Sequence, residues 1–266
     1  RRARVVAALA GGKLRRDEPA PHVTRLTIDN PDKRNALDHE ILDALAGALP
    51  RLDARCLLLT ATGKVFSAGY DIGALPQDDF ARAAEAIVAH PFTAAIEALD
   101  AFPFPVLAAL NGHAIGGGLE LALSCDLRVC SADARLGMPP ARLGLIYSHT
   151  GLRKFIDALG APRTRELFFT ARNIGAEEAL RWGLASKVAP PGRLREEALA
   201  MAEAVARNAP ISLRQAKRAI DGGFHLPLEE ALDLENRMYQ DCLGTKDRKE
   251  ALAAFAEKRP PVFHGE

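Results

Sequence analysis

Short apolar runs that alternate with amphipathic segments limit the fold of this chain more than any other feature of its sequence. Residues 56–59 and Val106–Leu110 are unbroken apolar stretches of strand length, which is typical of strands covered on both faces. Val23–Ile28 alternates apolar and polar residues, and residues 37–49 carry leucine and isoleucine at helical spacing. This order predicts an α/β core of repeated strand–strand–helix units.

The second half of the sequence is mainly helical from about residue 162 onward. Ala176–Trp182 is predicted as a short helix that ends at Gly183, because glycine readily adopts the left-handed conformation that follows helices. We predict two regions, a core over residues 1–195 and a helical region over residues 196–266. The amphipathic segments of the second region are residues 196–208, 211–220, 228–243 and 249–257.

The composition is that of a globular protein with balanced charge. Of the 266 residues, 48% are hydrophobic and 26% are charged, so the chain can bury a core without disulfides or metals. The 35 Lys and Arg residues balance 34 Asp and Glu residues, which gives no indication of a nucleic acid or a membrane as partner. The four cysteines form no CxxC pair, and no apolar run approaches the roughly 18–20 residues of a membrane span. We therefore expect a reduced, cytoplasmic protein.

The N-terminal segment allows two interpretations. Residues 1–16 carry six basic side chains, which is also the character of a transit-peptide remnant. The alternative is an edge strand at Arg4–Leu9, followed by a basic turn at Gly11 and Gly12. We favour the strand.

Two glycine-containing segments are candidates for a ligand site. Residues 65–71 have small side chains at 67–69, which leave backbone N–H groups unshielded, although an ordinary turn has the same pattern. Three glycines at 116–118 enter a predicted helix at 119–124, and such a corner stabilises anions through free N–H groups and the helix dipole. Glu120 lies in the first turn of this helix, where it either complements the dipole or faces the bound ligand.

The sequence excludes several common kinds of site. Gly112 and Gly116 are four residues apart, which does not match the GxGxxG spacing of dinucleotide-binding loops. Residues 63–69 do not form the GxSxG turn of a serine nucleophile. The seven histidines include no HExxH pair and no other spacing typical of metal ligands, so we expect no metal.

Five segments in order resemble the crotonase superfamily, that is, the enoyl-CoA hydratase/isomerase family. They are residues 30–37, 65–72, 112–126, 143–144 and 176–188, and the likeness covers the chain from about residue 22 to residue 263. The resemblance implies a crotonase-like α/β fold, a spiral of ββα units followed by helices that form a homotrimer or a hexamer of two trimers. It also implies an acyl-CoA thioester as substrate, with coenzyme A as part of that substrate and no separate cofactor.

The resemblance further implies roles for individual residues. The backbone N–H groups of Tyr70 and Gly117 would form an oxyanion hole for the thioester oxygen, and Glu120 would be the first catalytic glutamate. The residues that would bind substrate or coenzyme A are Ala68, Gly69, Asp71, Ile72, Gly116, Pro140 and Lys258.

The chain departs from the hydratases of this family at the second catalytic acid. Pro140 occupies the position of that glutamate, and proline can neither accept nor donate a proton. Hydration needs one group to activate water and another to protonate the α-carbon. Tyr147 falls where the methylmalonyl-CoA decarboxylases of the superfamily have a tyrosine, so a phenol would orient the substrate carboxylate; the alternative role is a packing aromatic.

Three functions follow from these observations. The first is a decarboxylase-like lyase that stabilises a thioester enolate and uses Glu120 and Tyr147. The second is an enoyl-CoA hydratase or isomerase that uses Glu120 alone or with Asp71, Glu97 or His149. The third is a non-catalytic acyl-CoA-binding protein.

Overall fold

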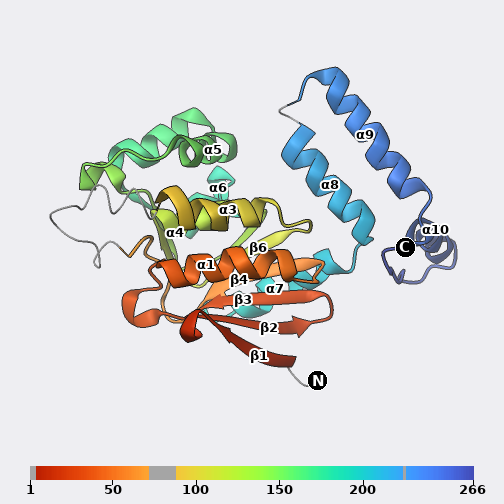
Figure 1. The fold of residues 1–266 in the computed structure, drawn as a ribbon, viewed down its shortest axis with the longest axis horizontal. Coiled ribbons are helices and arrows are strands. Elements are labelled where there is room, and N and C mark those ends of the chain that lie inside the picture. The colour runs from red at the N-terminus through yellow and green to blue at the C-terminus, as the bar shows by residue number, and fades with distance from the viewer. Residues whose placement is uncertain (1–3, 72–87, 224–225) are drawn as a thin grey trace.

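Two β-sheets form the centre of the molecule in the computed structural model, which describes residues 4–71, 88–223 and 226–266 (Figure 1). The larger sheet has the order β1 (Arg4–Leu9), β2 (Leu14–Ala20), β3 (Val23–Ile28), β4 (Cys56–Ala61), β6 (Val106–Leu110), β8 (Leu127–Ser131) and β11 (Lys187–Ala189). The smaller sheet has the order β10 (Asn173–Gly175), β9 (Arg135–Gly137), β7 (His113–Ile115) and β5 (Val65–Ser67).

The larger sheet begins as an antiparallel meander and continues as a parallel sheet. β1, β2 and β3 pair antiparallel, whereas β3, β4, β6, β8 and β11 pair parallel. The edge strand at Arg4–Leu9, the strand Val23–Ile28 and the strand Val106–Leu110 are confirmed. β2 was not predicted, because four consecutive charged residues at 15–18 hide its alternation.

Both faces of the parallel strands are covered, as their unbroken apolar runs predict. Leu57 and Leu59 belong to a core under α1 (His39–Ala48) and α3 (Thr93–Asp100). Leu58, which points the other way, belongs to a second core under α7 (Leu194–Ala206). The sequence pattern of residues 81–99 predicts a helix interrupted by Pro91. The structure shows a π-helical turn, Val88–Phe92, followed by α3, and residues 81–87 lie outside the described residues.

Six further α-helices follow in the described part of the chain, and three of them lie within residues 196–266, which were predicted as helical. Figure 1 shows α4 and α5 at one end and α8, α9 and α10 at the other. Their bounds, with α6, are α4 (Gly117–Leu123), α5 (His149–Thr170), α6 (Ala176–Trp182), α8 (Pro210–Gly223), α9 (Leu228–Leu243) and α10 (Lys246–Ala256). α5 begins well before residue 162, where we expected helix to start, and Gly160 interrupts its helical conformation at φ 73°.

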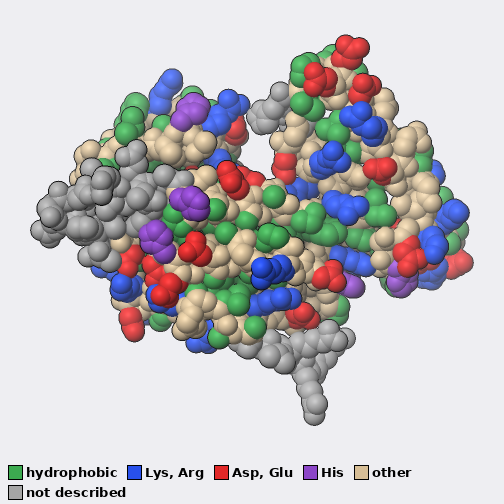
Figure 2. Space-filling model, in the orientation of Figure 1, with side chains coloured by type: hydrophobic (Ala, Val, Ile, Leu, Met, Phe, Trp, Pro, Cys, Tyr) green, Lys and Arg blue, Asp and Glu red, His purple; other side chains and the backbone are tan. Residues whose placement is uncertain are grey.

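The C-terminal helices are tied to the core by a few polar contacts. Lys217 of α8 donates to Asp126 at 2.7 Å and to the Phe104 carbonyl at 3.3 Å, and Arg55 donates to the Phe263 carbonyl at 2.9 Å. Basic and acidic side chains are interspersed over the face shown in Figure 2, in keeping with the balanced charge. Within the described residues, no helix combines the length and apolar character needed to cross a membrane.

Gly112 sets the distance between the turn before β7 and the chain entering β5. A Cβ at this position would lie 1.8 Å from the Lys64 carbonyl oxygen, which is backbone and cannot rotate away. We expect Gly112→Ala to lower the free energy of unfolding by at least about 2 kcal/mol, since overpacking forces the backbone to shift. Urea denaturation measures this change.

Gly47→Ala in α1 is the matched control, because a Cβ there meets nothing within 4 Å. We expect it to stabilise the protein by about 0.5–1 kcal/mol through helix propensity. Equal stability of the two variants would contradict the proposed packing of Gly112.

Candidate active site

A buried asparagine holds together the two loops from which the site is built. The Asn35 side chain is fully buried, and its Nδ2 donates to the carbonyls of Thr62 at 2.8 Å and Val65 at 2.6 Å. Its Oδ1 accepts from the Asn30 N–H at 2.8 Å. Asn35 thereby fixes the chain after β3 against the chain between β4 and β5. Asn35 is not among the residues that the sequence predicts for the site.

The backbone around Tyr70 leaves one N–H group free to bind a ligand. Leu37 N–H donates to the Gly69 carbonyl at 2.8 Å, and Asp71 N–H donates to the Leu37 carbonyl at 3.1 Å. This is a parallel bridge between Leu37 and Tyr70, so the Tyr70 N–H points to the opposite side of the chain. It donates to no other residue in the described part of the chain.

The glycines before α4 bring a second free N–H group to the same place. Gly116 adopts φ 57° and ψ −126°, a conformation open to glycine, and donates its N–H to the Gly137 carbonyl at 2.9 Å. Gly117 is the first residue of α4, and its N–H is one of those that a helix leaves without an internal partner. A Cβ on Gly69 would lie 3.2 Å from the Gly117 nitrogen and 2.9 Å from the Ile115 carbonyl oxygen. The two loops therefore meet only because residue 69 is glycine.

Glu120 is buried one turn into α4 and is paired with a tyrosine. Its side chain is 4% exposed, and its Oε2 accepts a hydrogen bond from the Tyr147 hydroxyl. Burial raises the pKa of Glu120 above its ordinary value, and the bond from Tyr147 offsets part of this shift. Burial also raises the pKa of the Tyr147 hydroxyl, so the phenol keeps its proton.

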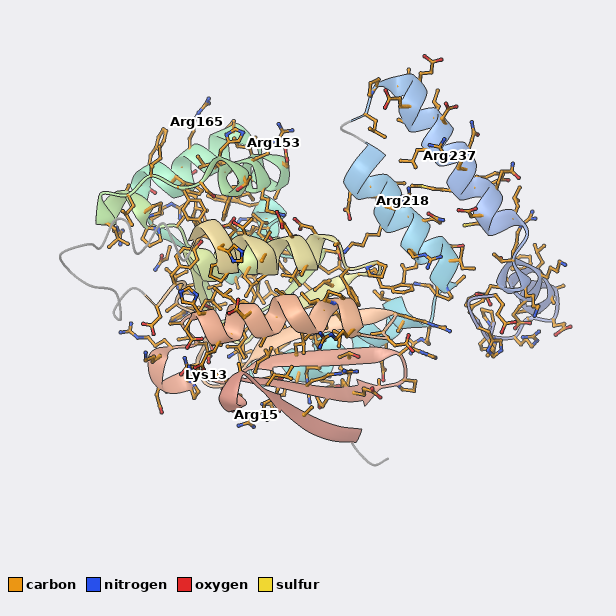
Figure 3. All side chains as sticks on the ribbon, in the orientation of Figure 1. Lys13, Arg15, Arg153, Arg165, Arg218 and Arg237 are labelled. Carbon is orange, nitrogen blue, oxygen red and sulfur yellow. The ribbon has the colours of Figure 1, made fainter. Side chains whose placement is uncertain are left out.

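The start of α5 makes room for this pair. Ser148 caps the helix by accepting from the Gly151 N–H at 3.2 Å. A Cβ on Gly151 would lie 2.6 Å from Tyr147 Cε1 and 2.9 Å from Glu120 Oε1. Arg153 and Arg165 project outward from α5 (Figure 3), so the helix turns its small and apolar side toward α4.

The Tyr70 side chain joins the same cluster. Its ring lies against Gly117, where a Cβ would be 2.9 Å from Cε1 and Cζ, and it packs edge-on against Phe92 with ring centres 4.9 Å apart. Its phenol lies beside that of Tyr147, and burial raises the pKa of the Tyr70 hydroxyl. The site thus combines two free N–H groups, one buried carboxyl group and two phenols.

A family model described as Enoyl-CoA hydratase/isomerase matches residues 19–266. This chain belongs to the enoyl-CoA hydratase/isomerase family. The short-chain-enoyl-CoA hydratase of Clostridium acetobutylicum is 36% identical over 244 residues, which are 89% of this chain and 92% of that protein. The enoyl-CoA isomerase/hydratase fer4 of Mycosarcoma maydis is 35% identical over 256 residues, which are 91% and 93% of the two chains.

Solved structures of the family share the whole architecture. The crystal structure of an enoyl-CoA hydratase from Bacillus anthracis matches with a TM-score of 0.87 at 34% identity, covering 96% of this chain and all of that one. The predicted crotonase-like α/β fold, with its C-terminal helices, is therefore confirmed. The resemblance to the family is confirmed as well, whereas the narrower likeness to decarboxylases remains a prediction.

The remaining residues that the family resemblance implies for the site lie in different places. Ala68 donates its N–H to the Arg34 carbonyl at 3.1 Å, and Asp71 accepts from Lys33 at 2.6 Å. Pro140 is buried at the start of a 3₁₀ turn, Pro140–Leu143, and Ile72 lies outside the described residues. Lys258 does not join the cluster within one chain: it is exposed and follows α10, and Figure 1 shows α10 at the opposite end of the molecule from α4.

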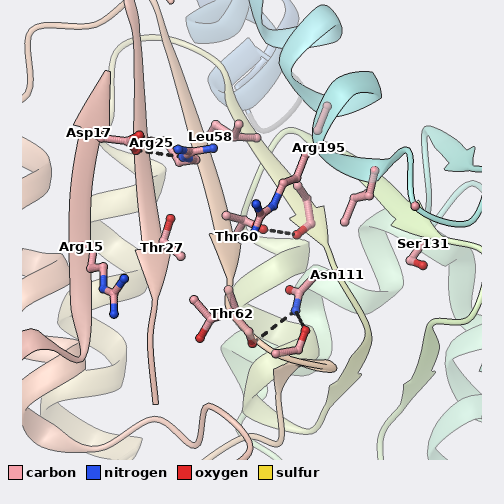
Figure 4. A pocket seen from close by; sticks show the side chains of 16 residues that line it. Arg15, Asp17, Arg25, Thr27, Leu58, Thr60, Thr62, Asn111, Ser131 and Arg195 are labelled. Atoms are coloured by element: carbon pink, nitrogen blue, oxygen red, sulfur yellow. Dashed lines mark hydrogen bonds and ion pairs between the residues drawn. The ribbon is translucent and has the colours of Figure 1, made fainter. Parts of the chain in front are cut away.

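A separate polar pocket lies beside α7, on the face of the larger sheet that does not pack against α1 and α3 (Figure 4). It measures about 410 Å³ and contains none of the residues of the cluster. Two of its arginines already have partners, since Arg15 pairs with Asp29 and Arg25 donates to Asp17 at 2.8 Å. Among the described residues, no group of three or more His, Cys, Asp or Glu side chains could hold a metal ion. The candidate site is therefore the cluster around Glu120.

Because the pKa of Glu120 is raised, we expect the free energy of unfolding to depend on pH through this residue. Between the ordinary value of 4.5 and the raised value, the folded protein holds a proton that the unfolded chain has released. The stabilisation is complete below pH 4.5 and is lost as the pH rises through the folded pKa. Because Glu120→Gln does not titrate, we expect its free energy of unfolding relative to wild type to rise across this window. The rise should be about 1.4 kcal/mol per unit of pKa shift.

Urea denaturation from about pH 4.5 to about pH 8 measures the effect. Glu97→Gln is the matched control, because Glu97 lies on the exposed side of α3. A stability difference between Glu120→Gln and wild type that does not change with pH would show that Glu120 ionises normally.

Proposed function

We propose that this protein is an acyl-CoA lyase that forms a thioester enolate by removing carbon dioxide from a malonyl-type substrate. The observation that carries the proposal is the pairing of Glu120 with Tyr147. In a family in which hydration uses two carboxylates, this chain has a buried proline at position 140, and the buried carboxyl group of Glu120 is engaged with a phenol. The arrangement suits a reaction that depends on stabilising and orienting negative charges on the substrate and does not depend on a strong base.

The first requirement of this reaction is stabilisation of the enolate oxygen. The Tyr70 and Gly117 N–H groups are free among the described residues and belong to loops in direct contact. Fixed donors of this kind oppose the developing negative charge, and removing one typically costs roughly 3–4 kcal/mol of transition-state stabilisation. The dipole of α4 adds to the effect, because Gly117 is at its N-terminus.

The second requirement is a correctly oriented substrate carboxylate. The bond between this carboxylate and the α-carbon breaks, its electron pair passes into the enolate, and carbon dioxide leaves. With substrate bound, the Tyr147 hydroxyl would direct its one hydrogen at this carboxylate instead of at Glu120, and so hold the carboxylate out of the thioester plane. A Glu120 whose pKa is raised by burial is neutral over a wider pH range, which reduces its repulsion of that carboxylate. Coenzyme A enters and leaves as part of the thioester, and the step needs no other cofactor.

Hydration or isomerisation with Glu120 is the second candidate. It is supported by the names of the relatives and by the position of Glu120 at the start of α4. The residues proposed to act with Glu120 are poorly placed for this reaction: Asp71 pairs with Lys33, while Glu97 and His149 are exposed. This candidate therefore depends on a single carboxyl group.

We also propose that the C-terminal helices assemble the chain into a homotrimer or a hexamer. Large apolar side chains on these helices support the proposal, since Leu228 of α9 is 76% exposed and Phe255 of α10 is 87% exposed in the single chain. Lys258 follows α10 and lies away from the Glu120 cluster, so its proposed contact with coenzyme A would be made in another copy of the chain.

Product analysis by mass spectrometry tests the decarboxylation. We expect wild type to convert methylmalonyl-CoA or ethylmalonyl-CoA to the acyl-CoA without the carboxylate. Tyr147→Phe should slow this reaction by about 100-fold, because the phenol that orients the carboxylate is lost. Tyr239→Phe is the matched control: it removes a phenol that is 60% exposed on α9.

The same proteins distinguish the other candidates. No carbon dioxide from either substrate would exclude the proposal. Loss of crotonyl-CoA absorbance that persists in Tyr147→Phe and disappears in Glu120→Ala would instead identify a hydratase. Tight binding of acyl-CoA without turnover of any thioester would indicate a binding protein.

A further inference from the structure

Tyr70 brings a side chain to the site as well as a backbone N–H group. Its ring rests on Gly117, whose own N–H is the other proposed oxyanion donor. Phe92 holds the ring from the edge, with an interplanar angle of 87°. The hydroxyl of Tyr70 therefore lies in the immediate neighbourhood of the position proposed for the thioester oxygen.

The hydroxyl is also part of a chain of oxygen atoms. The Tyr70 phenol lies beside the Tyr147 phenol, whose hydroxyl donates to Glu120 Oε2. A ring that served packing alone would leave this end of the side chain without a role, since phenylalanine fills the same space. Chains of buried hydrogen-bonded groups polarise one another and can pass protons along their length.

We propose that the Tyr70 hydroxyl donates the proton that converts the enolate to product, and that Tyr147 and Glu120 resupply it. This inference rests on the proposed decarboxylation. It assigns the step that follows loss of carbon dioxide, for which the chain has no second carboxylic acid at position 140.

The proposed step balances in protons and electrons. The O–H bond of Tyr70 breaks, and the electron pair of the enolate forms the new C–H bond at the α-carbon. The phenolate left on Tyr70 takes a proton from Tyr147, Tyr147 takes one from Glu120, and Glu120 recovers its proton from water.

A buried phenol suits this task. A thioester enolate is a much stronger base than a phenolate, so the transfer is downhill even from a weak acid. Burial raises the pKa of Tyr70 and keeps the proton on the phenol until the enolate forms. Because one residue provides both the N–H and the hydroxyl, the donor is held on one face of the enolate.

Decarboxylation of methylmalonyl-CoA in deuterium oxide tests the inference through the stereochemistry of the product. Wild type should place deuterium on one face of the α-carbon. Tyr70→Phe keeps the backbone N–H and the ring, so we expect KM to change little. Its kcat should fall by about 100-fold and its product should be racemic, because water then protonates the free enolate from either side.

The possible outcomes distinguish failure of the proposed decarboxylation from failure of the inference about Tyr70. If wild type releases no carbon dioxide, the proposed function fails and this inference fails with it. If wild type is active, a racemic wild-type product overturns the inference alone. A Tyr70→Phe variant that keeps the wild-type rate also overturns it, and so does a slow variant whose product stays stereospecific, which would assign Tyr70 to packing.

Two further variants allow the inference to be tested even if Tyr70→Phe does not fold. Tyr147→Phe interrupts the resupply of Tyr70 without touching the oxyanion loop, and it should lower the rate of turnover while leaving the first transfer stereospecific. Tyr239→Phe should match wild type in rate and stereochemistry, since Tyr239 lies on α9. If Tyr70→Phe does not fold, a racemic product from Tyr147→Phe would overturn the inference.

Discussion

The contact between Gly69 and the turn at Gly116–Gly117 is the constraint on which the rest of the site depends. Any side chain at position 69 would press on the Ile115 carbonyl and the Gly117 nitrogen, so the two free N–H groups would separate. Asn35 and Gly112 maintain the same approach from behind, one by hydrogen bonds to carbonyls and the other by having no Cβ. The oxyanion donors are therefore a product of backbone packing.

Against this rigid backbone, the side chains that carry protons form one connected group. Glu120 is on α4, Tyr147 precedes α5, and Tyr70 is on the loop after β5. Gly151 allows them to meet, because a larger residue there would displace both Tyr147 and Glu120. A single buried carboxyl group among two phenols favours the neutral forms of all three, which is unlike a pair of ionised glutamates around a water molecule.

Local patterns in the sequence predict much of the fold and less of the site. The strands Val23–Ile28 and Val106–Leu110 and the helices Ala176–Trp182 and Leu228–Leu243 match their predicted bounds, because hydrophobic periodicity and glycine or proline boundaries are local signals. The three-residue strands of the smaller sheet are too short to show a period. The early part of α5 was missed because Gly160 and Pro162 resemble a helix boundary.

The sequence does not predict the parts of the site that form by contacts between residues far apart in the sequence. Glycines 116–118 indicate an anion-binding corner by themselves, but nothing near Tyr70 indicates that its ring will cover Gly117 or reach Tyr147. The family resemblance assigns position 70 only a backbone role, which any residue can fill. A tyrosine there places a proton donor and an oxyanion donor on the same residue, so a movement that opens one also withdraws the other. Enolate stabilisation and protonation are thereby coupled by the covalent chain itself.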